Sequence, residues 1–454
     1  MTLPRHIAVI DIGKTNAKVV LIDSQSRQQV AVRTTPNVVR REGLYPHADV
    51  EMLWTFIVGS LRVLGAEHGI DGISITTHGA TAALMAGGVL AMPVLDYEHD
   101  GPEQTAEAYG EVRPPFSETL SPLLPNGLNL AAQIFWQANA FTQEFARATA
   151  ILTYPQYWAW RLTGVLASEV TSLGCHTDLW APATGTFSSL VSAQDWSGLF
   201  PEVRPAASVI GHLRPDVAQE TGLTSDTPVT CGIHDSNASL LPHLGQHEAP
   251  FTIISTGTWT IAMTVGGSTA QLDAGRDSLA NVDAFGRAVP TARFMGGREF
   301  DQLVPNIAEP RDEEIAAVID RDVRVQPSVT PGVGPFPQAK GGWTVDAETL
   351  GAGERTAAAS LYLALVTEAS LGLCGLGREI IIEGPLARNR LFASALGRLT
   401  GVPVYASGDA TGTSLGASML FGFGEAQRAS HAAIQSLAVP GFDEYAQRWR
   451  RSIA

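Results

Sequence analysis

A hairpin pattern that occurs twice sets the strongest limit on what this chain can fold into. The first copy is HIAVIDIGKTNAKVVLID, in which two β-rich runs flank a polar turn at Gly13. The second copy, PFTIISTGTWTIAMTVGG, follows about 240 residues later and has Gly257 in its turn. Two such hairpins predict two related α/β halves, each with a sheet that starts at its hairpin.

The two copies differ where the first strand ends. Asp11 precedes the first turn, whereas Ser255 occupies the corresponding place in the second copy. An aspartate at the end of a buried strand, beside a glycine turn, is a candidate metal ligand, and Thr15 and Lys18 add a hydroxyl and a cation nearby. We therefore expect metal and substrate in the first half and phosphate in the second. A plain polar turn is the alternative interpretation.

Length, composition and charge exclude several classes of protein. The 454 residues suffice for two or three domains, and the 45% hydrophobic and 17% charged fractions argue against disorder or a coiled coil. A net charge of -15 disfavours nucleic acid and anionic membrane surfaces as partners, although a local site can still bind phosphate. The three distant cysteines suggest neither a disulfide framework nor a zinc site, which favours a reducing cytoplasm.

The apolar segments are not expected to cross a membrane. The N-terminal apolar stretch meets Asp11 too early for a secretion signal, and the apolar run after Thr356 contains Glu368. A cytoplasmic protein without a membrane span is therefore expected.

Polar residues follow two further apolar strands. GISITTHGATAALM leads into a loop with Thr77 and His78, and TCGIHDSNASLL predicts a strand end, a loop and the start of a helix at Asn237. Ligands of open α/β sheets bind at such strand ends. Asp235 is a candidate general base, because phosphoryl transfer requires a carboxylate, a metal and backbone donors. A capping role for Asp235 and a structural role for His78 are the alternative interpretations of these positions.

Other nucleotide-binding and nucleophilic motifs are missing from the sequence. It contains no GxxxxGK[ST] and no GxGxxG after a strand, and Cys231 has no histidine at a diagnostic spacing, so it is interpreted as a packing residue. The C-terminal part predicts a long helix from Glu354 to Gly377, followed by a strand, a glycine turn, a helix and a strand.

Taken together, these segments resemble the FGGY carbohydrate kinases. The resemblance covers nearly the whole chain and rests on DIGKTNAK, THGAT, YPQYWAWRLTG, GIHDSNAS, STGTWT and EGPLARNRLFASALGRLTGVPV, which leads to ATGTSLGASM. It implies an α/β fold with two ribonuclease-H-like (actin-like ATPase) domains and a cleft between them. The N-terminal, sugar-binding domain would span 1–245, with a helical insertion at about 96–228, and the C-terminal, nucleotide-binding domain 246–454.

The resemblance also implies residue roles. Asp235 becomes the base for a sugar hydroxyl, with Thr77 and His78 as further sugar contacts, and Asp11 becomes the Mg²⁺ residue. The expected ATP-binding residues are Gly13, Thr15 and Lys18 in a first phosphate loop, Gly257 and Thr258 in a second, and Gly384 and Asn389 near the adenine.

Two departures from the family pattern lie at positions that are expected to bind the nucleotide. Lys14 stands where relatives usually have a small hydroxyl residue, and Glu383-Gly384-Pro385 replaces the usual Gly-Gly pair.

The activity implied by the resemblance is transfer of the γ-phosphoryl group of MgATP to a ketose. THGAT is closer to ketose-specific members than to glycerol kinases, and GIHD and STGTW are most similar to L-rhamnulose and L-fuculose kinases, which favours a deoxyhexulose. A pentulose (xylulose or ribulose) kinase, a nucleotide hydrolase and a non-catalytic actin-fold sensor of sugar or nucleotide are the alternatives. The expected partners are a small-molecule sugar and ATP, and a homodimer is one candidate assembly.

Overall fold

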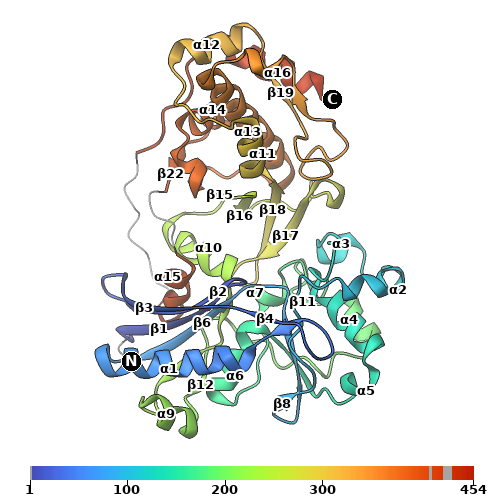
Figure 1. Cartoon of the computed structure of the whole chain (residues 1–454), viewed down its shortest axis with the longest axis vertical. Coiled ribbons are helices and arrows are strands. Elements are labelled where there is room, and N and C mark those ends of the chain that lie inside the picture. The colour runs from blue at the N-terminus through green and yellow to red at the C-terminus, as the bar shows by residue number, and fades with distance from the viewer. Residues whose placement is uncertain (1–2, 408–411, 423–431, 454) are drawn as a thin grey trace. The chain divides into compact units, whose positions relative to one another are not determined.

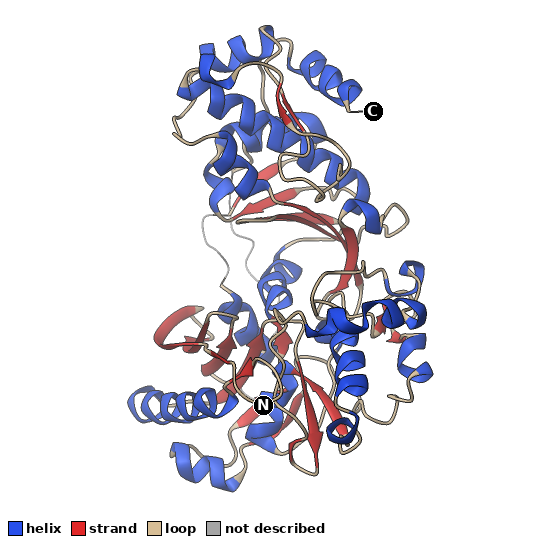
Figure 2. Ribbon diagram, turned by 45° about the vertical axis from the view of Figure 1, so that its right-hand side comes forward, coloured by secondary structure: helices blue, strands red, loops and turns tan. Residues whose placement is uncertain are grey.

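The computed structural model describes residues 3–407, 412–422 and 432–453, which form two compact units. Unit 1 takes its described residues from Met1–Gln246, Asn281–Arg287 and Thr411–Gln427. Unit 2 takes its described residues from His247–Ala280, Ala288–Ala410 and Arg428–Ala454. Each unit contains one mixed sheet with helices packed on it (Figure 2).

The sheet of unit 1 has seven strands, six of them in the order β12-β13-β6-β1-β2-β3. Three antiparallel strands begin it: β1 (His6–Ile12), β2 (Asn16–Asp23) and β3 (Gln28–Pro36). Strand β6 (Gly72–Thr77) is parallel to β1, and both β13 (Pro228–Thr230) and β14 (Ile233–His234) are parallel to β6. The edge strand β12 (Val209–His212) is antiparallel to β13.

Helices cover both faces of this sheet (Figure 1). Ala8, Ile10 and Ile12 of β1 pack with α1 (Val50–His68), α6 (Tyr154–Thr163) and α9 (Pro215–Thr221). Ile7 and Val9 pack on the opposite face with α10 (Asp235–Gln246) and α15 (Thr413–Ser418). Because side chains alternate along a strand, Asp11 belongs to the face of α10 and α15.

The stretch at 96–228 contains more than helices. Its short helices are η1 (Gly101–Thr105), α2 (Ala106–Val112), α3 (Phe116–Thr119), α4 (Leu130–Ala140), α5 (Thr142–Phe145), α7 (Val170–Leu173) and α8 (Ser189–Ala193). It also supplies α6, α9 and β12 to the main layers, and β9 (Ala150–Thr153) to a small sheet with β7 (Ala82–Ala86) and β8 (Val89–Leu90). Trp136, Trp180 and Trp196 lie in an apolar cluster of this region, so they are core residues.

The sheet of unit 2 repeats the plan with six strands in the order β17-β18-β16-β15-β21-β22. The strands β15 (Phe251–Thr256), β16 (Thr260–Val265) and β18 (Ala288–Phe294) are antiparallel in turn, and β17 (Ser278–Val282) is the edge strand beside β18. Strands β21 (Ile380–Glu383) and β22 (Val404–Ala406) extend the sheet in parallel with β15. The helices include α11 (Gly296–Leu303), α12 (Asp312–Asp320), α13 (Ala352–Cys374), α14 (Arg390–Thr400) and α16 (Phe442–Ser452).

The predicted recurrence of the hairpin is confirmed. In unit 1, β1 and β2 form an antiparallel pair with β6 parallel to β1, and in unit 2, β15 and β16 form such a pair with β21 parallel to β15. The chain therefore has the two ribonuclease-H-like, actin-like halves that the sequence predicts.

Helix α13 contains the apolar run after Thr356. By length and composition alone this 23-residue helix would be long and apolar enough to cross a membrane. However, 83% of its most apolar window is buried inside the fold, as in a core helix. It is the one such helix in the described part of the chain.

Candidate active site

Three neighbouring parallel strands of unit 1 bring most of the predicted residues of this half to one sheet edge. Asp11 lies near the end of β1, and the adjacent β6 ends at Thr77, which is paired with His234 at the end of β14. His78 and Asp235 directly follow these strands. The carboxyl ends of parallel strands are the usual binding edge of an α/β sheet. Two carboxylates and an imidazole therefore lie along one edge of the sheet.

Asp11 is held by a residue from far along the chain. Its Oδ2 accepts a hydrogen bond of 2.8 Å from the hydroxyl of Ser414 in α15, and Lys18 is its antiparallel partner on β2. Burial raises the pKa of Asp11, whereas Ser414 and Lys18 lower it and Asp235 raises it further. The effect of Asp235 on the pKa of Asp11 indicates that the two carboxylates lie in one electrostatic site.

The two oxygens of the Asp235 carboxylate have different surroundings. Oδ1 accepts a 2.6 Å hydrogen bond from the backbone N–H of Ser236 and lies 3.1 Å from Nε2 of His234. No described residue makes a hydrogen bond to Oδ2, and the side chain is 33% exposed. The carboxylate thus binds its own helix start through one oxygen, and the other has no hydrogen-bond partner among the described residues.

His78 lies among aromatic rings and is held in one tautomer. Its Nδ1–H donates to the carbonyl of Gly79 at 3.0 Å, and its ring contacts Tyr97 and Tyr154 at centroid distances of 5.3 and 5.1 Å. Burial lowers the pKa of His78, which favours the neutral ring with Nε2 as an acceptor. Thr77 is buried, and its hydroxyl donates to the His78 carbonyl, so the hydroxyl hydrogen already has an acceptor within the protein.

In the first turn predicted to bind phosphate, two of the predicted residues have exposed side chains. Thr15 and Lys18 are exposed, and the backbone N–H of Gly13 donates to the Asn16 carbonyl at 2.9 Å, which closes the turn. The side-chain amide of Asn37, which follows β3, donates to the Gly13 carbonyl at 2.8 Å. The turn is thus closed by one backbone hydrogen bond and braced by the Asn37 side chain, while the side chains of Thr15 and Lys18 remain exposed.

Lys14 is directed away from that turn. Its ammonium pairs with Asp96 and lies 3.3 Å from Glu98, and it lies over the ring of Tyr97 at 4.7 Å from the centroid. Tyr97 is the ring that contacts His78. The unusual lysine of the motif therefore joins the turn to the loop beside His78.

The second turn predicted to bind phosphate lies between β15 and β16 of unit 2. Gly257 and Thr258 are exposed, and the N–H of Gly257 donates to the Trp259 carbonyl at 2.9 Å. A Cβ at Gly257 would meet no described atom within 4 Å. The glycine is therefore not required by packing within the described chain.

Gly384 and Asn389 have structural partners in unit 2. Gly384 has a φ of 80°, and a Cβ there would lie 2.0 Å from the Thr256 carbonyl oxygen, so only glycine fits. Asn389 is the N-cap of α14, where its Oδ1 accepts from the N–H of Phe392 at 3.0 Å and its Nδ2 donates to the hydroxyl of Ser360 at 2.9 Å. Both positions shape the turn after β21, and their nucleotide role stays a prediction.

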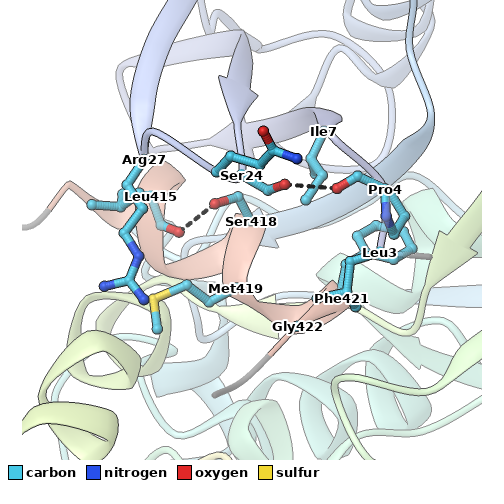
Figure 3. Close-up of a pocket in the computed structure, with 11 residues that line it drawn as sticks. Leu3, Pro4, Ile7, Ser24, Arg27, Leu415, Ser418, Met419, Phe421 and Gly422 are labelled. Carbon is cyan, nitrogen blue, oxygen red and sulfur yellow. Dashed lines mark hydrogen bonds between the residues drawn. The ribbon is translucent and has the colours of Figure 1, made fainter. Parts of the chain in front are cut away.

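A cavity of about 310 Å³ lies on another side of α15, within unit 1. Figure 3 shows Arg27, Leu415, Met419 and Phe421 around it. None of the predicted site residues lines this cavity, so we do not assign it to the sugar or the nucleotide.

Several contacts of the site join residues that are far apart in the sequence. Ser414, Asp96 and Cys175 reach it from segments remote from the residues that they contact, and only the three-dimensional structure brings them there. The three cysteines are free and buried, in agreement with the sequence. No group of three or more His, Cys, Asp or Glu side chains within the described ranges could hold a metal ion.

Proteins of known sequence are similar to this chain at low identity. The L-fuculokinase of Salmonella typhi is 24% identical over 265 residues, covering 57% of this chain and 56% of the relative. The xylulose kinase of Escherichia coli (strain K12) is 26% identical over 265 residues, covering 55% of this chain and 52% of the relative. The chain thus spans about half the length of the curated relatives that it matches.

Solved structures match over the full length. A carbohydrate kinase from Novosphingobium aromaticivorans has a TM-score of 0.91 at 35% identity, covering 100% of this chain and 99% of that one. A kinase from Brucella ovis, described as a xyloylose kinase, has a TM-score of 0.78 at 18% identity, covering 99% and 98%, which shows the fold alone.

Two family descriptions cover most of the sequence. "FGGY family of carbohydrate kinases, N-terminal domain" matches residues 6–242, and "Carbohydrate kinase FGGY, C-terminal domain" matches residues 248–431. Together with the two actin-like halves and the polar residues at the strand ends, these matches show that the chain belongs to the FGGY family of carbohydrate kinases.

Proposed function

We propose that this protein is an ATP-dependent sugar kinase that transfers the γ-phosphoryl group of MgATP to a hydroxyl of a ketose. The proposal is supported above all by the placement of Asp11, His78 and Asp235 at the ends of three adjacent parallel strands. A carboxylate for the metal and a carboxylate for the proton are groups that this reaction uses, and a neutral imidazole can bind a sugar hydroxyl beside them.

Asp235 is the proposed general base. As the acceptor oxygen attacks the γ-phosphorus, the hydroxyl proton passes to the carboxylate, a new P–O bond forms, and the bond to the ADP oxygen breaks. Oδ2 is suited to accept this proton, because Oδ1 is engaged by Ser236 and His234. The base is thereby oriented before the sugar arrives.

The donor groups near Asp11 fit a magnesium ion bound together with nucleotide. Mg²⁺ uses one or two carboxylates and completes its coordination with phosphate oxygens and water. Ser414 occupies Oδ2 of Asp11, and no described group makes a hydrogen bond to Oδ1. When bound, the ion neutralises charge on the phosphate oxygens. Asp11 would hold it, and Thr15, Lys18, Gly257 and Thr258 would bind phosphate.

The acceptor is proposed to be a deoxyhexulose such as L-fuculose or L-rhamnulose. GIHD and STGTW support this choice, and L-fuculokinases and a rhamnulokinase are among the relatives. A pentulose kinase is the second candidate, because xylulose kinases are found among the same relatives at similar identity. The proposed setting is cytoplasmic, with the sugar and ATP as partners.

The test is ADP release from MgATP with L-fuculose, L-rhamnulose, D-xylulose, L-xylulose, D-ribulose and no sugar. The wild-type protein should release ADP with one or two ketoses at a rate well above that without sugar. ADP release independent of sugar would indicate a hydrolase, and no release under any condition would indicate a non-catalytic sensor.

The variant Asp235→Asn links this activity to the site. It should lower kcat by roughly 100- to 10,000-fold, the usual range for the loss of a general base, while sugar still binds. Asp216→Asn is the matched control, because Asp216 also lies in the first turn of a helix of unit 1 but is exposed and paired with Arg214. An Asp235→Asn variant with normal turnover would contradict the assignment.

A further inference from the structure

A buried cysteine and histidine lie directly behind the proposed base. Cys175 follows α7 and His234 ends β14, and the two residues are 4% and 5% exposed. Sγ of Cys175 lies 3.7 Å from Nε2 of His234, and the same Nε2 lies 3.1 Å from Oδ1 of Asp235. One ring nitrogen is therefore shared between a sulfur and a carboxylate oxygen.

This geometry determines where the histidine carries a proton. A carboxylate oxygen can only accept, so a 3.1 Å approach to Nε2 is favourable when Nε2 bears a hydrogen. Two further features accommodate His234 here: a hydrogen bond fixes its backbone, and the absence of a side chain at Gly79 leaves room for its ring. The backbone N–H of His234 donates to the hydroxyl of Thr171 at 3.0 Å, and a Cβ at Gly79 would lie 2.8 Å from Nε2.

The charged and titratable groups around His234 come from four segments. Asp235 belongs to α10, Cys175 and His176 follow α7, Glu169 precedes α7, and His78 follows β6. Burial alone would lower the pKa of His234, but Cys175 and then Asp235 raise it to about 10. Burial alone would raise the pKa of Cys175, but His176 and His234 lower it to about 5. Both directions favour a thiolate beside a protonated imidazole.

We propose that Cys175 is a positioning residue for phosphoryl transfer: its sulfur keeps Nε2 of His234 protonated, and His234 then fixes Oδ1 of Asp235 so that Oδ2 faces the acceptor hydroxyl. The inference rests on the proposed function in that Asp235 is taken as the base. The Cys175–His234 pair itself is a property of the protein without substrates. The two can therefore be tested separately.

The first experiment measures the far-ultraviolet absorbance of thiolate against pH in the unliganded protein. Burial raises the pKa of Cys374 to about 11 and raises that of Cys231 still further, so a thiolate at neutral pH reports on Cys175 alone. We expect one thiolate in the wild-type protein, its loss in Cys175→Ser, and its retention in Cys231→Ala. A wild-type protein without thiolate at neutral pH would overturn the proposal whether or not it is a kinase.

The second experiment follows kcat against pH. In Cys175→Ala and Cys175→Ser the anion that favours protonated His234 is absent, so kcat should fall on the order of 10- to 100-fold as pH rises through the neutral range. The sugar KM should change little. The wild-type protein should keep its rate over that range, because His234 would lose its proton only at higher pH.

Cys231→Ala is the matched control for this experiment. It removes a fully buried thiol of the same unit without touching the Cys175–His234 pair. If Cys175→Ala and Cys231→Ala share one pH profile, Cys175 is only a packing residue and the proposal is wrong. If Cys175→Ser regains the wild-type profile, hydrogen bonding rather than charge positions His234, and the thiolate role is also wrong. Absence of sugar-dependent ADP release in the wild type would instead contradict the kinase function.

Discussion

Asp235 combines two tasks that its position in the sequence leaves as alternatives. It is the first residue of α10, and one oxygen binds the N–H of Ser236, as expected of a helix start. The other oxygen has no partner among the described residues and can accept a proton. A capping role and a catalytic role are therefore compatible, because a carboxylate has two oxygens.

At Asp11, we expect that Asp11→Asn raises the Mg²⁺ concentration needed for half-maximal turnover and lowers kcat, with sugar affinity unchanged. The amide keeps an oxygen that can accept from Ser414 but lacks the charge that Mg²⁺ requires. Kinetics at varied Mg²⁺ and calorimetry with sugar alone measure the two effects. Ser414→Ala is the control for the hydrogen bond. An equal loss of sugar affinity would make Asp11 a sugar ligand.

At His78, replacement by Ala should raise the sugar KM far more than the ATP KM. A buried polar group left without its partner costs about 1 to 3 kcal/mol, which corresponds to roughly 5- to 150-fold in affinity. His212→Ala is the control, since His212 is an exposed histidine at the end of β12 in the same unit. A change confined to the ATP KM would place His78 on the nucleotide side.

The sequence predicts the location of these residues better than their contacts. Asp11, His78 and Asp235 each follow an apolar run, and the strand period with a nearby glycine indicates a strand end. Their partners come from distant segments: Ser414 is 403 positions from Asp11, and Asp96 is 82 positions from Lys14. No local pattern encodes such pairs, so they cannot be predicted from spacing.

At the scale of the elements, the β1–β2 and β15–β16 hairpins follow directly from their apolar runs and glycine turns. The stretch at 96–228 is harder to predict. Its aromatic residues are typical of buried helices, yet β12 contributes to the main sheet with only four residues of mixed exposure. A strand this short has too few alternating residues to show a period.

Asn389 provides a test at the start of α14. Asn389→Ala should lower the free energy of unfolding by about 1 kcal/mol, because it removes the cap from the helix. Asn389→Asp keeps the acceptor for Phe392 and loses only the donor to Ser360, so it should be less destabilising. Denaturation of the unliganded protein measures both. If Asn389→Ala has unchanged stability and a raised ATP KM, Asn389 binds nucleotide and its capping of α14 does not stabilise the fold.

At the scale of the whole molecule, the prediction concerns ligands proposed to bind to different units. If sugar binds to unit 1 and nucleotide to unit 2, transfer requires the two ligands to meet and water to be excluded. We expect a smaller radius of gyration with sugar and a non-hydrolysable ATP analogue together than without ligands. Solution scattering with each ligand alone is the control. An unchanged radius would mean that binding does not bring the units closer.

The helix α15 has a consequence for how the protein is made. Ala417 belongs to the apolar cluster that contains Ile7, Val9 and Ile233, and the hydroxyl of Thr413 lies 3.0 Å from that of Ser239 in α10. During synthesis, the strands of unit 1 leave the ribosome first, whereas α15 is made only after most of unit 2. Until α15 is made, the apolar side chains on this face of the unit 1 sheet lack one of the helices that cover them. That helix is encoded more than four hundred codons after the first strand. Synthesis of α15, rather than completion of the N-terminal segment, is then the step that completes the core of unit 1.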